Sequence, residues 1–247
     1  FTFVFAGGAV VRKGVDIILK AYEKAFSAED DVCLVIKDHS GDAIYEKSEL
    51  RDEIKAFRDD PTKPALIYID EFLPEETLAS LFRSFDVGVF PYRAEGFCVP
   101  ILETMACGTP SLVPNLGPCV DFCDEDTSYL MPTLRINLPV NREMDLNLGF
   151  VEHIDEVDFC EVRVETLANF MREVYEAPAA ELEEKSRRGI ERAHAQFTWD
   201  RSAARVFELL GELDEPVIPR RMVSSRNEEA AQEKRKEMAR QLLSQSG

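Results

Sequence analysis

Positive charge is scarce in this sequence. Its 29 lysines and arginines face 47 aspartates and glutamates, which gives a formal net charge of −18 at neutral pH. A surface of this sign repels nucleic acid and anionic membranes overall. It sets no limit on a local phosphate pocket, because such a pocket needs only one or two cations. We therefore expect no nucleic-acid partner, whereas a phosphate-bearing ligand stays open.

Long apolar runs are missing as well. No stretch approaches the roughly 20 residues that a membrane-spanning helix requires. Hydrophobic residues nevertheless make up 45% of the chain, which is ample for a buried core. No signal peptide is visible, and the chain begins at Phe1 with a strand-like run. We expect no membrane span, a cytoplasmic location, and a further N-terminal region in the same polypeptide.

Cysteine pairs of the kind that bind metals are also absent. The six cysteines form no CxxC pair, and the spacing of Cys119 and Cys123 has no matching second pair. The sequence therefore predicts buried free thiols rather than a zinc site. The segment Asp124–Asp126 has the spacing of a metal-binding DxD motif, but it lies in a turn before a short apolar strand. We expect no metal and no cofactor.

Apolar runs alternate with helical periods along most of the chain. The predicted strands are 1–8, 32–37, 65–70, 87–91, 110–114 and 128–132, and the predicted helices are 15–26, 48–57, 73–85, 99–107, 164–176, 179–197 and 199–213. Strands that are apolar on both faces and alternate with helices predict an α/β fold with a Rossmann-like, doubly wound parallel sheet. Such sheets bind ligands beyond the carboxyl ends of their strands.

This regular pattern is interrupted once before it ends. Residues 134–161 are polar and irregular, and we interpret them as an insertion or an extended loop. The sequence predicts one domain over 1–214, including this insertion. Residues 215–247 are polar and charged, which is typical of a linker or a marginal helical tail. Gly108 follows the 99–107 helix where a C-terminal cap would place a glycine.

The stretch EGFCVPILE places two carboxylates, Glu95 and Glu103, eight positions apart around the start of a helix. Helix N-terminal N–H groups suit a phosphate or a polar sugar edge. Those groups would belong to Gly96, Phe97, Cys98 and Val99. Glu95 could accept hydrogen bonds from ligand hydroxyls, and Glu103 could hold the two vicinal hydroxyls of a ribose. The alternative is a solvated loop glutamate and an ordinary charge on a helix surface.

A second candidate element is GGAVVRKGVD, which joins the first strand to the first helix. Gly7 and Gly8 allow a tight turn there. Lys13 could neutralise a diphosphate as a point charge, with Arg12 beside it. The alternative is a basic loop at a strand–helix junction that binds no ligand.

Three sequence blocks carry a family resemblance. They are GG…RKGVDIILKAY, LPEETLASLFRSFDVGVFPYRAEGFCVPILETMACGTP and AHAQFTWDRSAARVFELL, in this order. They resemble the C-terminal domain of retaining GT-B glycosyltransferases of the large family-four type, the glycosyl transferases group 1. The resemblance covers 1–133 and resumes over 162–213. It implies the C-terminal half of a GT-B fold that binds a nucleoside diphosphate sugar as donor substrate and works with an N-terminal acceptor domain, which this chain lacks.

The resemblance also implies roles for individual residues. Glu95 matches the first glutamate of the family's E-x7-E motif, which contacts the donor sugar, and Glu103 matches the second, which holds the ribose. Gly96 and Phe97 match residues whose amides meet the donor, and Lys13 matches the lysine that binds the diphosphate. The implied activity is metal-independent sugar transfer with retention of configuration, in which stabilisation of the leaving diphosphate is the main contribution of this half.

The sequence departs from the family pattern in two places. Many relatives carry an arginine, a second diphosphate cation, at the position of Gly8. Many also have a glycine pair at the start of the segment Leu116–Pro118, whose proline has no N–H to offer. Arg12 could replace the missing arginine, so Glu95, Lys13 and Arg12 are the expected catalytic residues. Donor binding is expected despite these departures, whereas catalytic competence depends on that replacement.

Two other functions stay open at this point. One is a non-catalytic nucleotide-sugar-binding or assembly module derived from a glycosyltransferase. The other is a GT-B nucleotide-sugar epimerase. The E-x7-E spacing and the ending FTWDRSAARVFELL favour a transferase. The sequence predicts neither the sugar, the base nor the acceptor, whether that is a glycan, a protein or a small molecule.

Overall fold

The structure is a computed structural model and describes residues 1–38, 49–139 and 156–212. Six parallel strands form one sheet in the order β3-β2-β1-β4-β5-β6. The strands are β1 (Thr2–Ala6), β2 (Cys33–Lys37), β3 (Ala65–Ile69), β4 (Val87–Val89), β5 (Ser111–Pro114) and β6 (Tyr129–Met131). This strand order reverses between β1 and β4, so the predicted doubly wound parallel sheet is confirmed.

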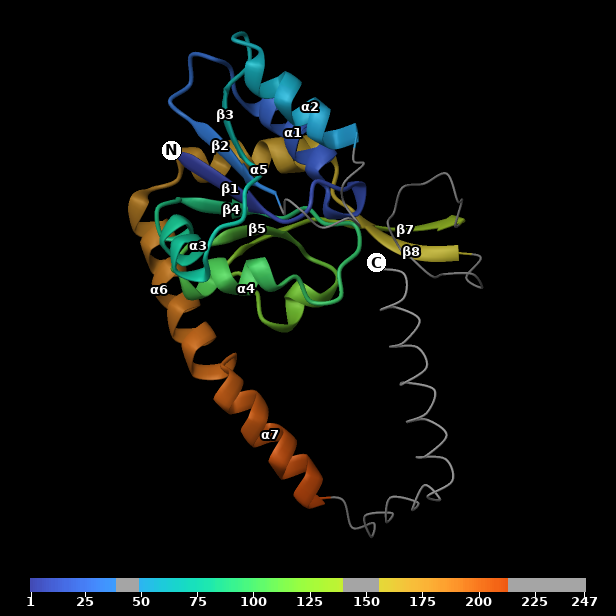
Figure 1. Cartoon of the computed structure of the whole chain (residues 1–247), viewed down its shortest axis with the longest axis vertical. Coiled ribbons are helices and arrows are strands. Elements are labelled where there is room, and N and C mark those ends of the chain that lie inside the picture. Colours follow the sequence, from blue (N-terminus) through green and yellow to red (C-terminus); the bar gives the residue numbers. More distant parts are fainter. Residues whose placement is uncertain (39–48, 140–155, 213–247) are drawn as a thin grey trace, which may run out of the picture. The chain divides into compact units, whose positions relative to one another are not determined.

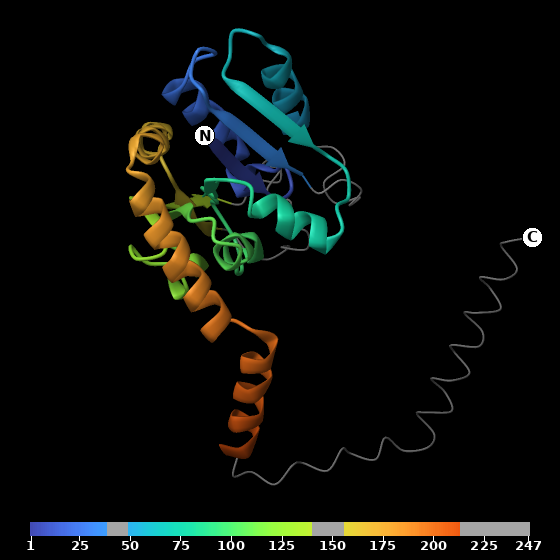
Figure 2. The same ribbon diagram turned by 90° about the vertical axis from the view of Figure 1, so that its left-hand side faces the viewer.

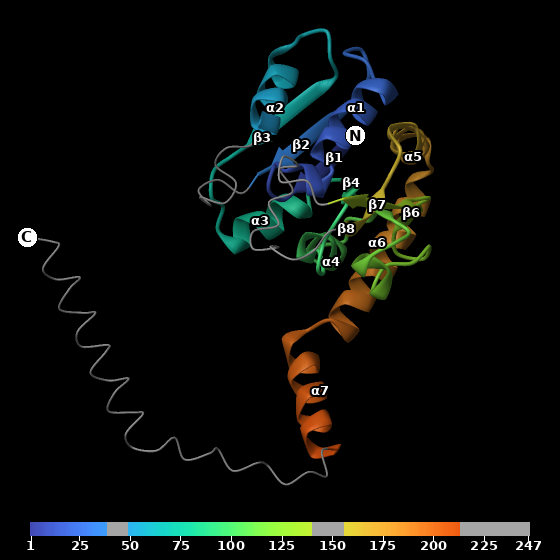
Figure 3. The ribbon, with the colours of Figure 1, turned by 90° about the vertical axis from the view of Figure 1, so that its right-hand side faces the viewer.

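Helices cover both faces of the sheet (Figure 1). They are α1 (Val15–Ala25), α2 (Glu49–Asp59), α3 (Glu75–Phe82), α4 (Val99–Ala106), α5 (Val164–Glu176) and α6 (Ala179–Gln196), with short 3-10 turns η1 (Val11–Lys13) and η2 (Pro118–Asp121). One layer contains α1 and α2 with α5 packed on α1, and the other contains α3 and α4 with α6 packed on α4. Figure 2 and Figure 3 show these layers from opposite sides.

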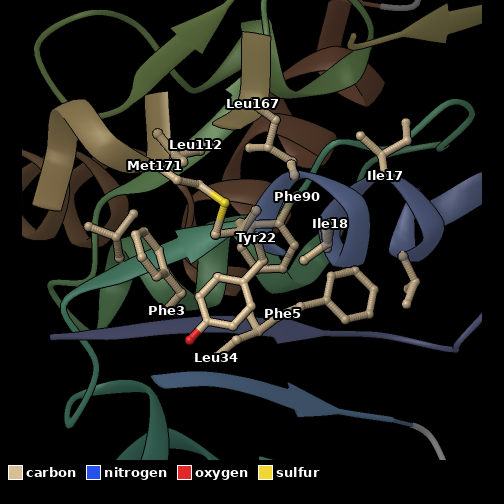
Figure 4. Packing of buried hydrophobic residues seen from close by; sticks show 14 of the residues in the cluster. Phe3, Phe5, Ile17, Ile18, Tyr22, Leu34, Phe90, Leu112, Leu167 and Met171 are labelled. Carbon is tan, nitrogen blue, oxygen red and sulfur yellow. The ribbon is translucent and has the colours of Figure 1, made fainter. Parts of the chain in front are cut away.

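The core lies between β1 and the layer of α1 and α5 (Figure 4). Phe3 and Phe5 of β1 and Ile18 of α1 are fully buried, and Met171 of α5 closes the cluster. Burying one such side chain stabilises the fold by roughly 1.5–3 kcal/mol. Tyr22 lies in the same cluster, and its hydroxyl donates a hydrogen bond to the Ala65 carbonyl at 2.8 Å. Its polar atom is therefore satisfied inside an apolar core.

The end of α4 is set by the glycine that the sequence indicated. Gly108 has a φ of 86°, in the left-handed region. The Gly108 N–H donates to the Met105 carbonyl, and the Thr109 N–H donates to the Thr104 carbonyl at 2.9 Å. These bonds satisfy two carbonyls at the end of the helix. The predicted cap is confirmed, and it turns the chain from α4 into β5.

The segment 134–161 differs from the irregular loop that we predicted. Its two ends form β7 (Leu134–Pro139) and β8 (Glu156–Glu161), which pair as a two-stranded antiparallel ribbon (Figure 1). Residues 140–155 lie outside the described part of the chain. A period of two is present in Leu134, Arg135, Ile136 and Asn137, but it spans too few residues to stand out from a polar sequence.

The chain divides into two compact units. One covers 1–198, and the other begins at Trp199 with α7 (Trp199–Glu212). The helix predicted over 199–213 is therefore present. The predicted boundary at 214 stays a prediction, and the predicted tail 215–247 lies outside the described residues. None of the helices that the structure describes has both the length and the apolar character to cross a bilayer.

Candidate functional site

The loops after β1 and β4 meet at the carboxyl edge of the sheet. Their strands are neighbours, with Phe3 opposite Val87. Gly14, at the start of α1, has a φ of 78°, and a Cβ atom on it would lie 2.2 Å from the Pro91 carbonyl oxygen. Only glycine fits such a contact between two backbones. The loop that carries Lys13 and the loop that carries Glu95 are therefore in direct backbone contact, at Gly14 and Pro91.

Lys13, Arg12 and Glu95 form one cluster between these loops. The Lys13 ammonium group donates a hydrogen bond to Glu95 Oε1. The Arg12 Nη1 lies 3.4 Å from the same oxygen and 3.4 Å from the Ala94 carbonyl oxygen. The side chains of Lys13 and Glu95 are only 14% and 9% exposed. Glu95 is therefore not a solvated loop residue, and the three predicted catalytic residues lie together.

The glycines before this cluster shape the first loop. The Gly7 N–H donates to the Lys37 carbonyl at 2.9 Å, and the Gly8 carbonyl accepts from the Val10 N–H at 2.8 Å. Both glycines are buried. The loop thus makes the tight turn that the sequence predicted. Gly8 brings no cation, and the Arg12 guanidinium lies beside Glu95 instead.

Arg93 is a site residue that the sequence interpretation missed. Its guanidinium binds both carboxylate oxygens of Asp16, at 2.7 and 2.9 Å, and donates to Glu161 Oε2 at 2.6 Å. It also donates to the Val11 carbonyl at 2.6 Å, while the Arg93 N–H donates to the Arg12 carbonyl at 2.7 Å. Burial opposes the charge of Arg93, but its two carboxylate partners outweigh burial and raise its pKa.

Arg93 therefore joins three parts of the chain. Asp16 belongs to α1, Arg93 to the loop that carries Glu95, and Glu161 to the end of β8. A bidentate arginine–carboxylate pair fixes distance as well as orientation. The only signal in the sequence is a charged residue soon after a buried strand, and this signal does not reveal the partners.

Asp38 holds the other end of the first loop and was also missed. It follows β2, is fully buried, and accepts a hydrogen bond from the Ala9 N–H at 3.0 Å. Arg51 Nε and the Tyr68 hydroxyl donate to its other oxygen at 2.8 and 2.7 Å. Burial, followed by the hydrogen bond to Asp38, raises the pKa of Tyr68. Asp38 and Arg93 thus anchor the loop from both sides.

Lys37 precedes Asp38 and lies inside the protein. Its side chain is buried, and its ammonium group donates to the Asp38 carbonyl. Burial lowers its pKa. Lys37 therefore has a structural role at the end of β2, next to the loop that follows β1.

The helix α4 begins with an unusual backbone conformation. Cys98, its N-cap, has a φ of 65° and is the one non-glycine residue with a positive φ in the described chain. Such a conformation costs roughly 1–3 kcal/mol and clusters at functional sites. Burial, followed by the nearby Glu95 charge, raises the pKa of the Cys98 thiol to about 12. Cys98 is therefore an inert, buried thiol that helps to shape the loop.

The other residues predicted to line the donor lie around this N-cap. A Cβ atom on Gly96 would have no heavy atom within 4 Å, so its backbone is open to a ligand. Phe97 is 40% exposed and packs against Phe122, with 5.0 Å between ring centroids. Val99 is half exposed at the first turn of α4. The open backbone is therefore at Gly96, whereas the Phe97 ring is held against Phe122.

Glu103 has different surroundings from Glu95. Its side chain is on an exposed part of α4. Neighbouring protein atoms desolvate it in part, and together with the Glu75 carboxylate they raise its pKa. The structure thus places the two carboxylates of the motif in opposite electrostatic surroundings.

The Asp124–Asp126 segment is bound to α6. Asp124 pairs with Arg192 at 2.6 Å, and Asp126 pairs with Arg188. Within the described ranges, no group of three or more histidines, cysteines or acidic residues could hold a metal ion. All six cysteines are free thiols. The Asp124 and Asp126 carboxylates therefore serve as contacts with α6.

Comparison with known proteins extends these observations. A D-inositol 3-phosphate glycosyltransferase of Mycobacteroides abscessus is 26% identical over 188 residues, which are 70% of this chain and 40% of that protein. The crystal structure of Anabaena HepE in complex with UDP and glucose matches 86% of this chain and 48% of that chain, with a TM-score of 0.61 and 15% identity. The chain therefore spans less than half the length of both proteins.

A third comparison concerns a single domain. The C-terminal domain of LpcC, a glycosyl transferase group 1 family protein of Francisella tularensis, matches 80% of this chain and 86% of its own length, with a TM-score of 0.56 and 16% identity. The neighbours are GT-B glycosyltransferases, as the sequence predicted. The family model for glycosyl transferases group 1 matches residues 1–136, more than half of the 247 residues. The chain therefore belongs to the glycosyl transferases group 1.

Proposed function

We propose that this chain binds a nucleoside diphosphate sugar and, together with an N-terminal domain of the same polypeptide, transfers the sugar to an acceptor without a metal ion and with retention of configuration. The observation that carries this proposal is the cluster of Lys13, Arg12 and Glu95 at the carboxyl edge of the sheet. Two cations and one carboxylate meet there beside the open backbone of Gly96. Cations suit the diphosphate, and the carboxylate suits the hydroxyls of the sugar.

The roles within this site follow from its charges. Lys13 and Arg12 stabilise the negative charge that develops on the leaving diphosphate. Glu95 accepts hydrogen bonds from the sugar and keeps both cations in place. Glu103, with its raised pKa, accepts from the ribose hydroxyls. The HepE structure holds UDP and glucose, which supports a donor of this class.

Transfer also requires an acceptor, and we propose that a second, N-terminal domain of the same polypeptide binds it across a cleft. The chain matches 86% of the C-terminal domain of LpcC but only 40% of the Mycobacteroides abscessus glycosyltransferase. Fixing two reactants in position lowers a barrier by up to about 7–11 kcal/mol. The chain by itself is therefore expected to bind donor and to transfer almost no sugar, whereas the polypeptide with both domains transfers it.

A thermal-shift screen with UDP, GDP, ADP and their sugar conjugates tests donor binding. Ligand at about 100 times its dissociation constant stabilises a protein by about 2.7 kcal/mol. Lys13→Ala should abolish the shift, whereas Lys20→Ala, which removes an exposed lysine of α1, should preserve it. If no nucleotide stabilises the wild-type chain, the proposal is wrong.

Removal of metal tests the mechanism separately. Donor affinity should be the same in EDTA and in millimolar magnesium, because Lys13 and Arg12 supply the positive charge. Calorimetry under both conditions gives the answer. Binding that EDTA abolishes and magnesium restores would contradict the proposed phosphate site.

Product analysis with the complete polypeptide tests transfer and stereochemistry. A product that keeps the donor's anomeric configuration supports a retaining transferase. Donor binding without transfer by both the chain and the complete polypeptide would instead indicate a binding module. A changed sugar on the nucleotide would indicate an epimerase.

A further inference from the structure

A cleft of about 260 Å³ lies next to the Glu95 cluster. The loop of Tyr92 and Glu95 lines it on one side, Gly117 and its neighbours on a second, and the β7–β8 ribbon on a third. The ribbon contributes Arg135 and Asp158 to this lining. Clefts for drug-sized ligands measure roughly 300–1,000 Å³. A volume just below this range suits a single sugar ring.

The register of the ribbon shows which of its side chains share one face. Arg135 pairs with Cys160, and Asn137 pairs with Asp158. Because alternate residues of a strand point to the same face, these four side chains lie on one face of the ribbon. The Asn137 side-chain amide donates to Asp158 Oδ1 at 3.0 Å. Phe159, between Asp158 and Cys160, is buried and also lines the cleft.

Two contacts fix this polar face beside Glu95. The Cys160 N–H donates to the Arg93 carbonyl at 2.8 Å, and Glu161 binds the Arg93 guanidinium at 2.6 Å. Arg93 is two residues before Glu95. The cleft is therefore continuous with the proposed donor site, and its ribbon wall is held by the residue that also holds the first loop.

The charges of the cleft balance one another. Its lining contains two positive side chains, Arg93 and Arg135, and two negative ones, Glu95 and Asp158. A cleft without net charge favours neither an anion nor a cation. Hydroxyl groups both donate and accept hydrogen bonds, so a guanidinium and a carboxylate can bind them at the same time.

We propose that this cleft binds a neutral, hydroxyl-rich sugar or polyol unit through Arg135 and Asp158. The proposal rests on the proposed function, because it places the unit beside the donor-binding cluster. The unit comes either from the donor, as its glycosyl group, or from the acceptor. In both cases the β7–β8 ribbon, which lies between β6 and α5 in the chain, takes part in ligand recognition.

The variant Arg135→Ala/Asp158→Ala tests this proposal without changing the net charge. Its matched control is Arg58→Ala/Asp59→Ala, which removes an exposed ion pair of α2. Calorimetry compares UDP with UDP-glucose and GDP with GDP-mannose for all three proteins. Nuclear magnetic resonance saturation transfer then measures free glucose and free mannose in the presence of saturating UDP or GDP.

The two sources give different results. If the cleft binds the donor's glycosyl group, the cleft variant loses about tenfold in affinity for the nucleotide sugar, and the free nucleotide binds as before. If it binds the acceptor, nucleotide-sugar affinity stays the same and the free-sugar signal of the wild-type chain is lost in the cleft variant. The control should match the wild-type chain in every measurement.

Three outcomes would overturn the proposal. One is unchanged binding of nucleotide sugars and of free sugars in the cleft variant. Another is an equal loss of free nucleotide and nucleotide sugar, which would indicate damage to the whole site. A wild-type chain that binds no nucleotide would refute the proposed function itself. This result is distinct from nucleotide binding that the cleft variant leaves unchanged, which would refute only the role of the ribbon.

Discussion

The two carboxylates of the E-x7-E stretch occupy regions of contrasting character. Glu95 is nearly buried and lies against Lys13 and Arg12, on a loop that Arg93 holds in place. Glu103 is exposed on α4, where partial desolvation and then the carboxylate of Glu75 raise its pKa. The protein therefore stabilises the ionised carboxylate of Glu95 with two cations and destabilises the ionised carboxylate of Glu103.

This contrast separates a carboxylate that contributes to both folding and ligand binding, Glu95, from one that contributes to ligand binding alone, Glu103. A carboxylate with two cations contributes to the architecture of its site, so its removal changes both the fold around it and the ligand. A carboxylate that faces another carboxylate contributes nothing favourable to the ligand-free protein. Residues that violate local energetic rules are typical of binding sites. Substitutions in the two regions should therefore affect folding and binding in different proportions.

The largest effect is expected at Gly14. Gly14→Ala would force a Cβ atom against the Pro91 carbonyl and would strain a φ of 78°, so it should destabilise the protein by at least about 3 kcal/mol. The matched substitution Gly96→Ala has open space around it and should change stability by less than about 0.5 kcal/mol. Urea unfolding of both variants measures this difference. Equal stabilities would show that the loops of the Glu95 region are not locked together.

A smaller effect separates the two carboxylates in binding. Glu95→Gln should weaken the nucleotide sugar by roughly 1.5–3 kcal/mol, through loss of a hydrogen bond to a charged group. Free nucleoside diphosphate should bind at least as tightly as before, because Lys13 and Arg12 lose a competing carboxylate. Glu103→Gln should weaken both ligands to the same extent, because both contain ribose. Calorimetry with the two ligands measures these four changes.

Two results would remove this division between the carboxylates. One is an equal loss of free nucleotide in both variants. The other is a Glu103→Gln variant that loses only the nucleotide sugar, since this would place the sugar at the exposed end of the motif. Unfolding midpoints of the two proteins serve as the control, because Glu95→Gln alone should lower the midpoint.

Sequence reasoning succeeded where chemistry is local. The alternation of apolar runs and helical periods predicted every strand of the large sheet, and it placed the loops of Lys13, Arg12 and Glu95 at the carboxyl ends of those strands. It failed where partners are distant in the chain. Arg93 and Glu161 are 68 positions apart, and no local pattern connects them.

The ribbon and the start of α4 were missed for other physical reasons. Strands β7 and β8 have short alternating patterns and pair only with each other, so neither has the continuous apolar signal of a central strand. The left-handed backbone of Cys98 contradicts local preference, because a non-glycine residue seldom adopts it. Tertiary contacts impose this conformation, and a single sequence does not reveal them.

The smallest predicted effect concerns the stability of the ligand-free protein as a function of pH. Partial desolvation and the Glu75 carboxylate raise the pKa of Glu103 above its ordinary value. The folded protein therefore binds the proton of Glu103 more tightly than the unfolded chain does, and the ionised carboxylate costs stability at neutral pH. This cost disappears as the pH falls through the raised pKa of the folded state.

Glu103→Gln should thus be slightly more stable than the wild-type chain at pH 7, by a few tenths of a kcal/mol, because exposed charges interact weakly. The difference should shrink on acidification and vanish well below the ordinary glutamate pKa of 4.5, where the carboxyl is protonated in both the folded and the unfolded states. Urea unfolding between pH 4 and pH 7 measures this difference. The control is Glu76→Gln, which removes the other carboxylate of the first turn of α3, next to Glu75. A wild-type chain that is more stable than Glu103→Gln at pH 7 would show that Glu103 is already satisfied by the protein and would remove the contrast with Glu95.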